Sequence, residues 1–161
     1  MISNKKKSEK REDKIAGDIE GHRHVMSGAT WSKKGDVSND KILIEDKFTD
    51  DIKYSLTRKT ILKNNKEAGI VDKIPVISLG FEKYKTDYAI IQLEYHKDYL
   101  ACIDVSASIR GKKDSKSITL LYSRLNELFL NKKEPYLGLV VFDIKGKYYK
   151  YLVYDLNTFL D

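Results

Sequence analysis

The sequence predicts an α/β (α+β) fold in which helices flank a mixed central β-sheet. Two observations lead to this class. Segments rich in helix formers alternate with short apolar segments rich in β-branched and aromatic residues, in the order helix, strands, helix, strands. This order is typical of layered folds. The chain also has 161 residues with 41% hydrophobic content, which suffices for one ordinary core but not for two full-sized domains.

Two helices and one strand are predicted in the first part of the chain. Residues 6–19 have the composition and the three-to-four spacing of a short helix. Residues 41–49, "KILIEDKFT", are predicted to form a strand, because β-branched and aromatic residues are bounded by turn-prone "SND" and "DD". Residues 54–68 are predicted to be helical. The side chains expected on the buried side of that helix are Leu56, Ile61, Leu62 and Ala68.

Apolar strands and a further helix follow. The stretches "IPVISLGF" and "YAIIQLEY" are apolar enough to be central strands. Residues 118–130 carry a clear amphipathic stripe and are predicted to form a helix. Residues 135–156 are predicted to form a hairpin whose turn lies around Gly146.

Residues 1–100 are predicted to form the main core, with residues 101–161 as a helix-and-hairpin extension packed on it. Two stretches, "KIPVISLGFEKYKTDYAIIQLEY" and "KEPYLGLVVFDIKGKYYKYLVYD", both run proline, strand, charged turn, aromatic strand. The likeness indicates either an internal duplication or the ordinary pattern of any helix–strand–hairpin unit. In a duplication Ser106 would stand opposite Lys47, and the second copy, a degenerate half-repeat, would be inert.

Composition limits the class of partner and the compartment. Thirty basic residues against 24 acidic ones give a formal charge of +6, which favours an anionic partner, nucleic acid above all. Cys102 is the only cysteine, so a disulfide framework and a cysteine-rich zinc site are excluded. No apolar run approaches the roughly 18 residues that span a bilayer. We therefore expect a cytoplasmic protein with no membrane partner.

The predicted strand at residues 41–49 carries three consecutive charges. Side chains alternate along a strand, so Glu45 and Lys47 share one face and Asp46 points to the other. Asp36 would return beside Glu45 if residues 38–41 formed the turn of a hairpin. Two converging carboxylates repel each other unless a cation lies between them, and oxygen ligands suit Mg²⁺, with Mn²⁺ expected to substitute. A lysine on the same face would add positive charge for a phosphate.

These residues resemble a known family. "GDV" followed by "LIEDK" is similar to the active-site pattern of the PD-(D/E)XK nuclease superfamily, with Gly35-Asp36 in place of Pro-Asp. The segments "SEKREDKIAGD", "RHVMSGA" and "LIEDKFT" resemble the corresponding segments of the Holliday-junction resolvase-like endonucleases of bacteriophages. The resemblance runs from about Ser8 to Leu100. It implies a restriction-endonuclease-like core and a magnesium-dependent endonuclease of DNA recombination, acting as a homodimer on branched DNA.

Site residues carried over from this resemblance come from three segments. The resemblance implies that Glu9, Asp36 and Glu45 bind the metal, that Lys47 is the catalytic lysine, and that Ser27 contacts the scissile phosphate. Asp46 departs from the pattern, because that position is more often small or apolar. A buried carboxylate needs a partner, either a basic residue of the first helix or a backbone amide, unless Asp46 rather than Glu45 is the ligand.

Basic residues around this site indicate where DNA would bind. Arg23, His24, Lys33 and Lys34 flank the charged strand and are predicted to contact the DNA backbone, although solvation explains each of them equally simply. Lys59, Lys63 and Lys66 are expected to form the solvated face of the middle helix, or to follow a phosphate strand.

Three alternatives remain open at the level of the sequence. The chain is an active resolvase, a nickase or restriction-type nuclease of the same superfamily, or a catalytically silent DNA-binding or assembly protein that keeps the nuclease fold. The final third either supplies a dimer surface or, as a degenerate half-copy, fills the place of a partner and makes the protein a pseudo-dimeric monomer.

Overall fold

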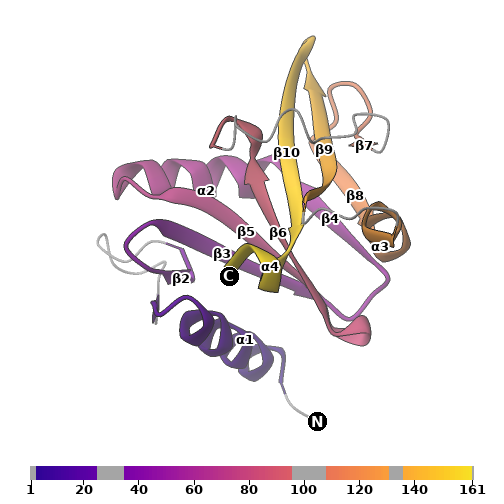
Figure 1. Ribbon diagram of the computed structural model, residues 1–161. Helices are drawn as coiled ribbons and strands as arrows, with labels where there is room; N and C mark the ends of the chain where they lie inside the picture. Colours follow the sequence, from indigo (N-terminus) through magenta and orange to yellow (C-terminus); the bar gives the residue numbers. More distant parts are fainter. Residues whose placement is uncertain (1–2, 25–34, 96–107, 131–135, 161) are drawn as a thin grey trace.

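The computed structural model describes residues 3–24, 35–95, 108–130 and 136–160 (Figure 1). Within them, eight strands form one mixed sheet flanked by helices, which confirms the predicted fold class at this level. The strands follow one another across the sheet in the order β1 (His22–Arg23), β2 (Val37–Ser38), β3 (Ile42–Thr49), β5 (Ile74–Phe81), β6 (Thr86–Gln92), β10 (Lys147–Asp155), β9 (Tyr136–Ile144) and β7 (Ser108–Arg110).

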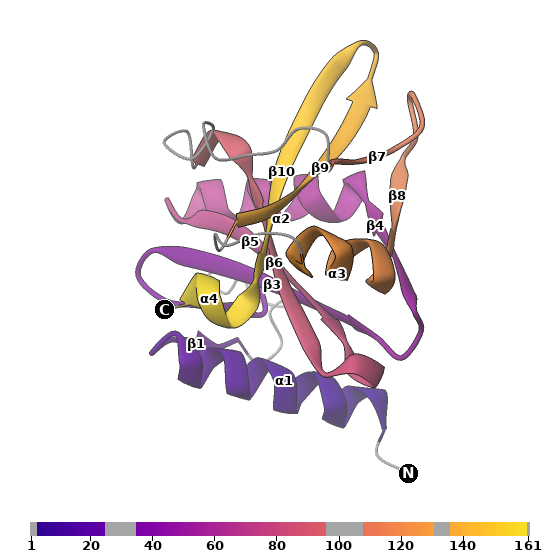
Figure 2. The same cartoon turned by 45° about the vertical axis from the view of Figure 1, so that its right-hand side comes forward.

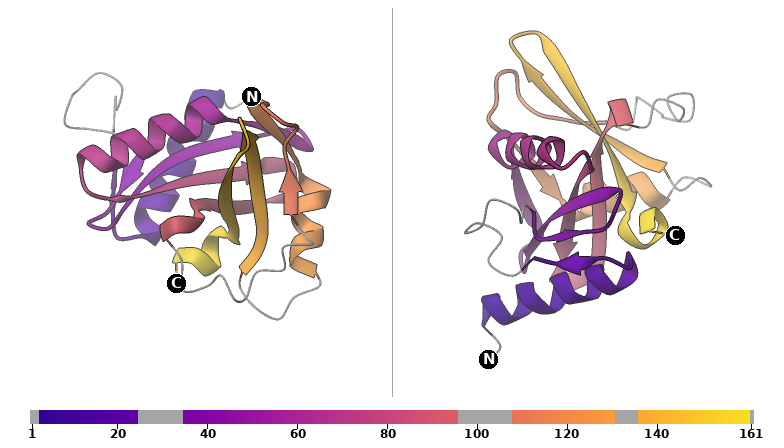
Figure 3. Two further views of the ribbon diagram at one scale, coloured as in Figure 1. Left: turned by 90° about the horizontal axis from the view of Figure 1, so that it is seen from above. Right: turned by 90° about the vertical axis from the view of Figure 1, so that its left-hand side faces the viewer.

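Helices cover both faces of the sheet, and each face has its own apolar cluster. On one face lie α1 (Asn4–Asp18) and the short α4 (Leu156–Leu160), over a cluster centred on Ile44, Val76 and Ile91. On the other face lie α2 (Arg58–Ile70) and α3 (Tyr122–Leu130), over a cluster that includes Leu79 and Phe142. Figure 3 shows α1 and α2 on opposite sides of β3 and β5. No helix among the described residues is long and apolar enough to cross a membrane.

The middle helix and the last long helix are both shorter than predicted. Residues 53–57 form β4 (Lys53–Thr57) and residues 117–121 form β8 (Ser117–Leu121), and these two strands pair with each other (Figure 2). The Thr57 side chain then caps α2 by accepting a hydrogen bond from the Thr60 amide at 3.1 Å. Ile61 and Ala68 are buried as predicted, but Leu62 is 50% exposed, because consecutive helical residues point about 100° apart and Leu62 lies outside the buried stripe.

The other predicted strands and the hairpin turn are present. β3 and β5 match the stretches predicted as strands, and a 3-10 turn, η1 (Glu82–Tyr84), joins β5 to β6. β6 ends at Gln92, three residues before the end of the predicted strand "YAIIQLEY". Lys145 and Gly146 both have positive φ, 51° and 76°, as the tight turn between β9 and β10 requires. The segment predicted as an extension therefore adds strands to the same sheet, where β10 pairs with β6.

The structure consists of two similar units joined side by side. We call β3, β4, α2, β5 and β6 the first unit, and β7, β8, α3, β9 and β10 the second unit. In each unit a strand pairs in parallel with the first arm of an antiparallel hairpin, and a strand leads directly into a helix. The units meet where β6 pairs with β10 and where β4 pairs with β8, both antiparallel.

Aromatic packing repeats between the units. Phe81 and Tyr88 of the first unit form an edge-to-face pair, with ring centroids 6.0 Å apart and an interplanar angle of 82°. Phe142 and Tyr151 of the second unit have the same separation and angle. In both hairpins the tyrosine lies opposite a buried aliphatic residue, Leu79 or Val140, two residues before the phenylalanine. This shared geometry identifies the residues that correspond in the two units.

Candidate active site

A hairpin brings Asp36 next to Glu45, as the sequence predicted. Val37 pairs with Ile44, and the Asp36 amide donates to the Ile44 carbonyl at 2.9 Å. Asn39 closes the turn, because its side-chain oxygen accepts hydrogen bonds from two amides that follow it in the chain. Gly35, immediately before the aspartate, has φ +68°, and a Cβ there would lie 2.8 Å from the Leu43 side chain. The glycine of "GDV" is therefore required for this approach.

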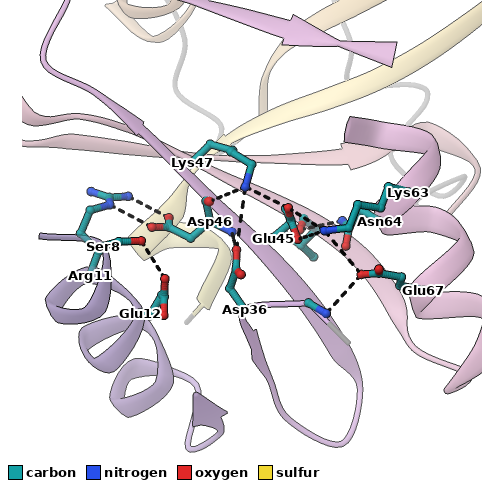
Figure 4. Close-up of polar contacts among 12 residues, drawn as sticks. Ser8, Arg11, Glu12, Asp36, Glu45, Asp46, Lys47, Lys63, Asn64 and Glu67 are labelled. Atoms are coloured by element: carbon teal, nitrogen blue, oxygen red, sulfur yellow. Dashed lines mark hydrogen bonds and ion pairs between the residues drawn. The ribbon is translucent and has the colours of Figure 1, made fainter. Parts of the chain in front are cut away.

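The three charges of β3 point to two faces. Asp46 faces α1, its side chain is completely buried, and Arg11 donates to both of its carboxylate oxygens at 3.0 and 3.1 Å. This pairing confirms the expectation of a basic partner from the first helix. Because Arg11 holds Asp46 on the far side of the sheet, the alternative that the Asp46 carboxylate replaces Glu45 as the metal ligand does not fit the geometry (Figure 4).

Three oxygen atoms converge on the Lys47 ammonium, on the face covered by α2. The Lys47 Nζ lies 2.9 Å from Glu45 Oε1, 3.0 Å from the Asp46 carbonyl oxygen and 4.0 Å from Asp36 Oδ2 (Figure 4). Each oxygen comes from a different residue of the β2–β3 hairpin or the turn before it. The ammonium shows where a positive charge is stabilised in this part of the molecule.

Burial and the neighbouring charges shift the pKa values of Asp36, Glu45 and Lys47. Burial, together with the nearby charge of Glu45, raises the pKa of Asp36 to about 6. Burial alone would raise the pKa of Glu45 too, but hydrogen bonds and charge from Lys47 and Lys63 outweigh it and lower that pKa. Burial opposes the charge on Lys47, yet the two carboxylates raise its pKa. Lys47 is thus an ammonium at neutral pH, and a second cation would relieve Asp36.

The same residues fit a divalent metal ion. Mg²⁺ and Mn²⁺ prefer carboxylate and carbonyl oxygens, which is the set that Asp36, Glu45 and the Asp46 carbonyl present around one point. Burial and the charge of Glu45 raise the pKa of Asp36, so a cation bound here would favour its ionised form. Among the described side chains, no group of three or more His, Cys, Asp or Glu gathers into a metal site, so the backbone carbonyl is the third ligand available here.

Sequence reasoning missed three side chains that complete this site. From α2, Lys63 donates to both Glu45 carboxylate oxygens, at 3.3 and 3.4 Å, although it was expected on a solvated or DNA-facing surface. Glu67, one turn later, accepts a hydrogen bond from the Gly35 amide at 3.3 Å. Tyr54 of β4 lies close enough for its ionisation to be coupled to Lys47 and Glu45, and burial raises its pKa.

The predicted glutamate of the first helix is not among the residues in contact with this site. Within the described chain, no hydrogen bond or ion pair joins Glu9 to Asp36 or Glu45. The charge of Glu12, three residues further along α1, instead acts on Asp36, and Ser8 donates a hydrogen bond to Glu12 at 2.8 Å. The role predicted for Glu9 remains a prediction, and Glu12 is the α1 carboxylate whose charge raises the pKa of Asp36.

Of the four residues predicted to contact DNA, the structure describes Arg23 and His24. Arg23 binds α1 carboxylates, with its Nε 2.6 Å from Asp13 Oδ1. His24 lies 3.1 Å from the Ser38 hydroxyl through its Nε2, so it belongs to the β2 side of the hairpin. Ser27, Lys33 and Lys34 lie outside the described residues.

A basic groove lies beside the site. It has a volume of about 750 Å³, and its lining extends from the end of β4 along α2 to the start of β8. Lys63 lines this groove and also contacts Glu45, so this lysine links the groove to the site. The cationic side chains that line it are Arg58, Lys59, Lys63, Lys66 and Lys116.

Comparison with known proteins adds no family. A scan against protein-family models finds no match, and a search of curated proteins finds none at a significant level.

Proposed function

We propose that the protein is a metal-dependent DNA endonuclease with a PD-(D/E)XK-type core, acting on branched DNA such as a Holliday junction. One observation carries the proposal: the oxygens of Asp36, Glu45 and the Asp46 carbonyl surround a single cationic position on β3. The basic groove that shares Lys63 with this site supports a polyanionic substrate. The branched substrate, and the assignment of the core to that superfamily, rest on the resemblance of "GDV" and "LIEDK".

Each side chain has a role in this proposal. Asp36 and Glu45 would hold Mg²⁺ or Mn²⁺ together with the Asp46 carbonyl. A bound divalent metal ion activates water as a nucleophile and stabilises charge on a phosphate. Lys47, protonated at neutral pH, would turn from the carboxylates toward the scissile phosphate and donate hydrogen bonds to its oxygens. Lys63 would keep Glu45 in place while facing the DNA in the groove.

The DNA backbone would follow the groove along α2. Its lysines and Arg58 would contact phosphates as positive charges that position the DNA without reading its sequence. This type of contact suits an enzyme that recognises the shape of its substrate.

The test is cleavage of a synthetic four-way junction with Mg²⁺, beside a linear duplex and a flap. Wild type, Lys47→Ala and the control Lys112→Ala, an exposed lysine outside the groove, are compared for both binding and cleavage. We expect cleavage near the branch by wild type and control, and loss of cleavage with retained binding in Lys47→Ala. Binding by wild type without cleavage under Mg²⁺ or Mn²⁺ would overturn the nuclease and leave a silent DNA-binding protein.

A further inference from the structure

The two units meet as two copies related by a two-fold axis would meet. Where β6 pairs with β10, Ile90 lies directly opposite Val153, and these two residues correspond by their positions in the two hairpins. Where β4 pairs with β8, Ser55 lies opposite Thr119, and each is the third residue of its strand. In a symmetric dimer, a residue on the two-fold axis of an antiparallel strand pair lies opposite the same residue of the other subunit. Ile90 with Val153, and Ser55 with Thr119, reproduce this arrangement within one chain.

At three positions that can be compared among the described residues, the second unit has side chains that differ from those of the site. Lys47 pairs with Leu79, and the residue in the same relation to Val140 is Ile109. The sequence comparison places Ser106 opposite Lys47, and the strand register corrects this assignment by three residues. Tyr54, the second residue of β4, corresponds to Ile118 in β8. In the helices, the sixth residue is Lys63 in α2 and Glu127 in α3.

The second unit also ends the sheet where the first continues. Beyond β3 lies β2, and the residue immediately before β2 is Asp36. Beyond β7 the described residues contain no further strand, so β7 is the last strand of the sheet in that direction. No counterpart of the Asp36 hairpin is therefore present in the described part of the second unit.

From these observations we infer that the second unit is a non-catalytic partner fused to the first. It occupies the position that a second subunit would take, so the protein is a monomer with one active centre. With the endonuclease activity proposed above, on which this part rests, the consequence is one nick for each binding event. The homodimer expected from the resemblance is replaced by a pseudo-dimer within one chain.

The second unit keeps a role in binding, because it forms part of the groove. Lys116 and Ser117, at the start of β8, line the groove opposite α2. The Arg58 amide donates to the Lys116 carbonyl at 2.9 Å, and the Arg58 guanidinium lies over the Tyr149 ring of β10, 5.5 Å from its centroid. The second unit thus positions a wall of the groove and adds Lys116 as a phosphate-binding side chain.

The oligomeric state is tested by light scattering on the full chain, alone and with a four-way junction, over a range of protein concentrations. We expect the mass of one chain, 18.6 kDa, throughout, and one chain for each junction bound. A concentration-dependent mass of two chains would overturn the inference. This readout does not depend on cleavage, so it remains decisive if the proposed nuclease activity fails.

The product is tested with a supercoiled plasmid that carries a cruciform. We expect open circles to accumulate first, with linear DNA appearing only as a later product. When wild type is mixed with inactive Lys47→Ala, the cleavage rate should fall only in proportion to the fraction of wild-type protein. Linear DNA formed without an open-circle intermediate, and lost in the mixture, would show paired active sites and contradict a single centre.

Lys116 is tested against Lys112, which lies on the same connection but outside the groove. Lys116→Ala should weaken junction binding severalfold and reduce the slope of log affinity against log salt by about one, while Lys112→Ala leaves both unchanged. If the two variants bound the junction equally well, the second unit would have no role in DNA binding.

Discussion

The two units have the same framework but differ in what they place on it. Both have the parallel strand pair, the antiparallel hairpin and an edge-to-face aromatic pair of equal geometry. The first unit puts Glu45, Asp46 and Lys47 into the middle of its strand, whereas the second has Ile109 where Lys47 stands. The second unit forms the same framework with Ser108 and Ile109 where Asp46 and Lys47 stand, so the framework itself does not require these two charges.

Loss of a charge partner in the first unit should lower the free energy of unfolding. Arg11→Met would leave the buried Asp46 carboxylate unpaired, and we expect the free energy of unfolding to fall by about 3–5 kcal/mol. Chemical denaturation measures this loss. The second unit has Ser108 at the position of Asp46, so the double variant Arg11→Met/Asp46→Ser should recover a large part of the stability. No recovery would mean that Arg11 acts mainly through its other partners, Asp87 and Glu82.

The ionised Asp36 carboxylate should lower the free energy of unfolding at neutral pH. The described part of the second unit has no corresponding carboxylate. Its pKa is raised to about 6, so the folded state binds a proton more tightly than the unfolded state. Its favourable contribution is complete below about pH 4 and is lost as the pH rises through about 6. Asp36→Asn should therefore raise the free energy of unfolding at neutral pH, without divalent metal, by about 1–3 kcal/mol.

This expectation is measured by denaturation at several pH values in the presence of a chelator. The exposed Asp18→Asn serves as the matched control and should follow wild type at every pH. If Asp36→Asn kept the same pH dependence as wild type, the carboxylate pair would not be strained, and the argument for a cation between them would lose its electrostatic support.

Local features of the site could be predicted from the sequence, and tertiary ones could not. The approach of Asp36 to Glu45 follows from a short hairpin with the turn-prone "SND". A basic partner for Asp46 follows from the cost of burying a charge. The contact of Lys63 with Glu45 depends on how α2 lies across β3, which no local pattern specifies. Glu9 and Glu12 lie on neighbouring positions of one helix face, so spacing alone did not distinguish them.

The two strands mistaken for helix show the same limit. Residues 53–57 and 117–121 become strands because they pair with each other across the two units. Each alone has apolar spacing that also suits a helix, and the pairing partner lies far away in the sequence. The likeness of the two hairpins was visible in the sequence, but the symmetric pairing that supports a duplication was not.

The most direct measurement of the central claim is a calorimetric titration with Mn²⁺ at neutral pH, on wild type, Glu45→Gln and the control Asp18→Asn. We expect saturable binding to wild type and to the control, and its loss in Glu45→Gln, because the Glu45 and Asp36 carboxylates would hold the metal ion. Absence of binding to wild type, or binding that survives in Glu45→Gln, would contradict a metal centre on β3.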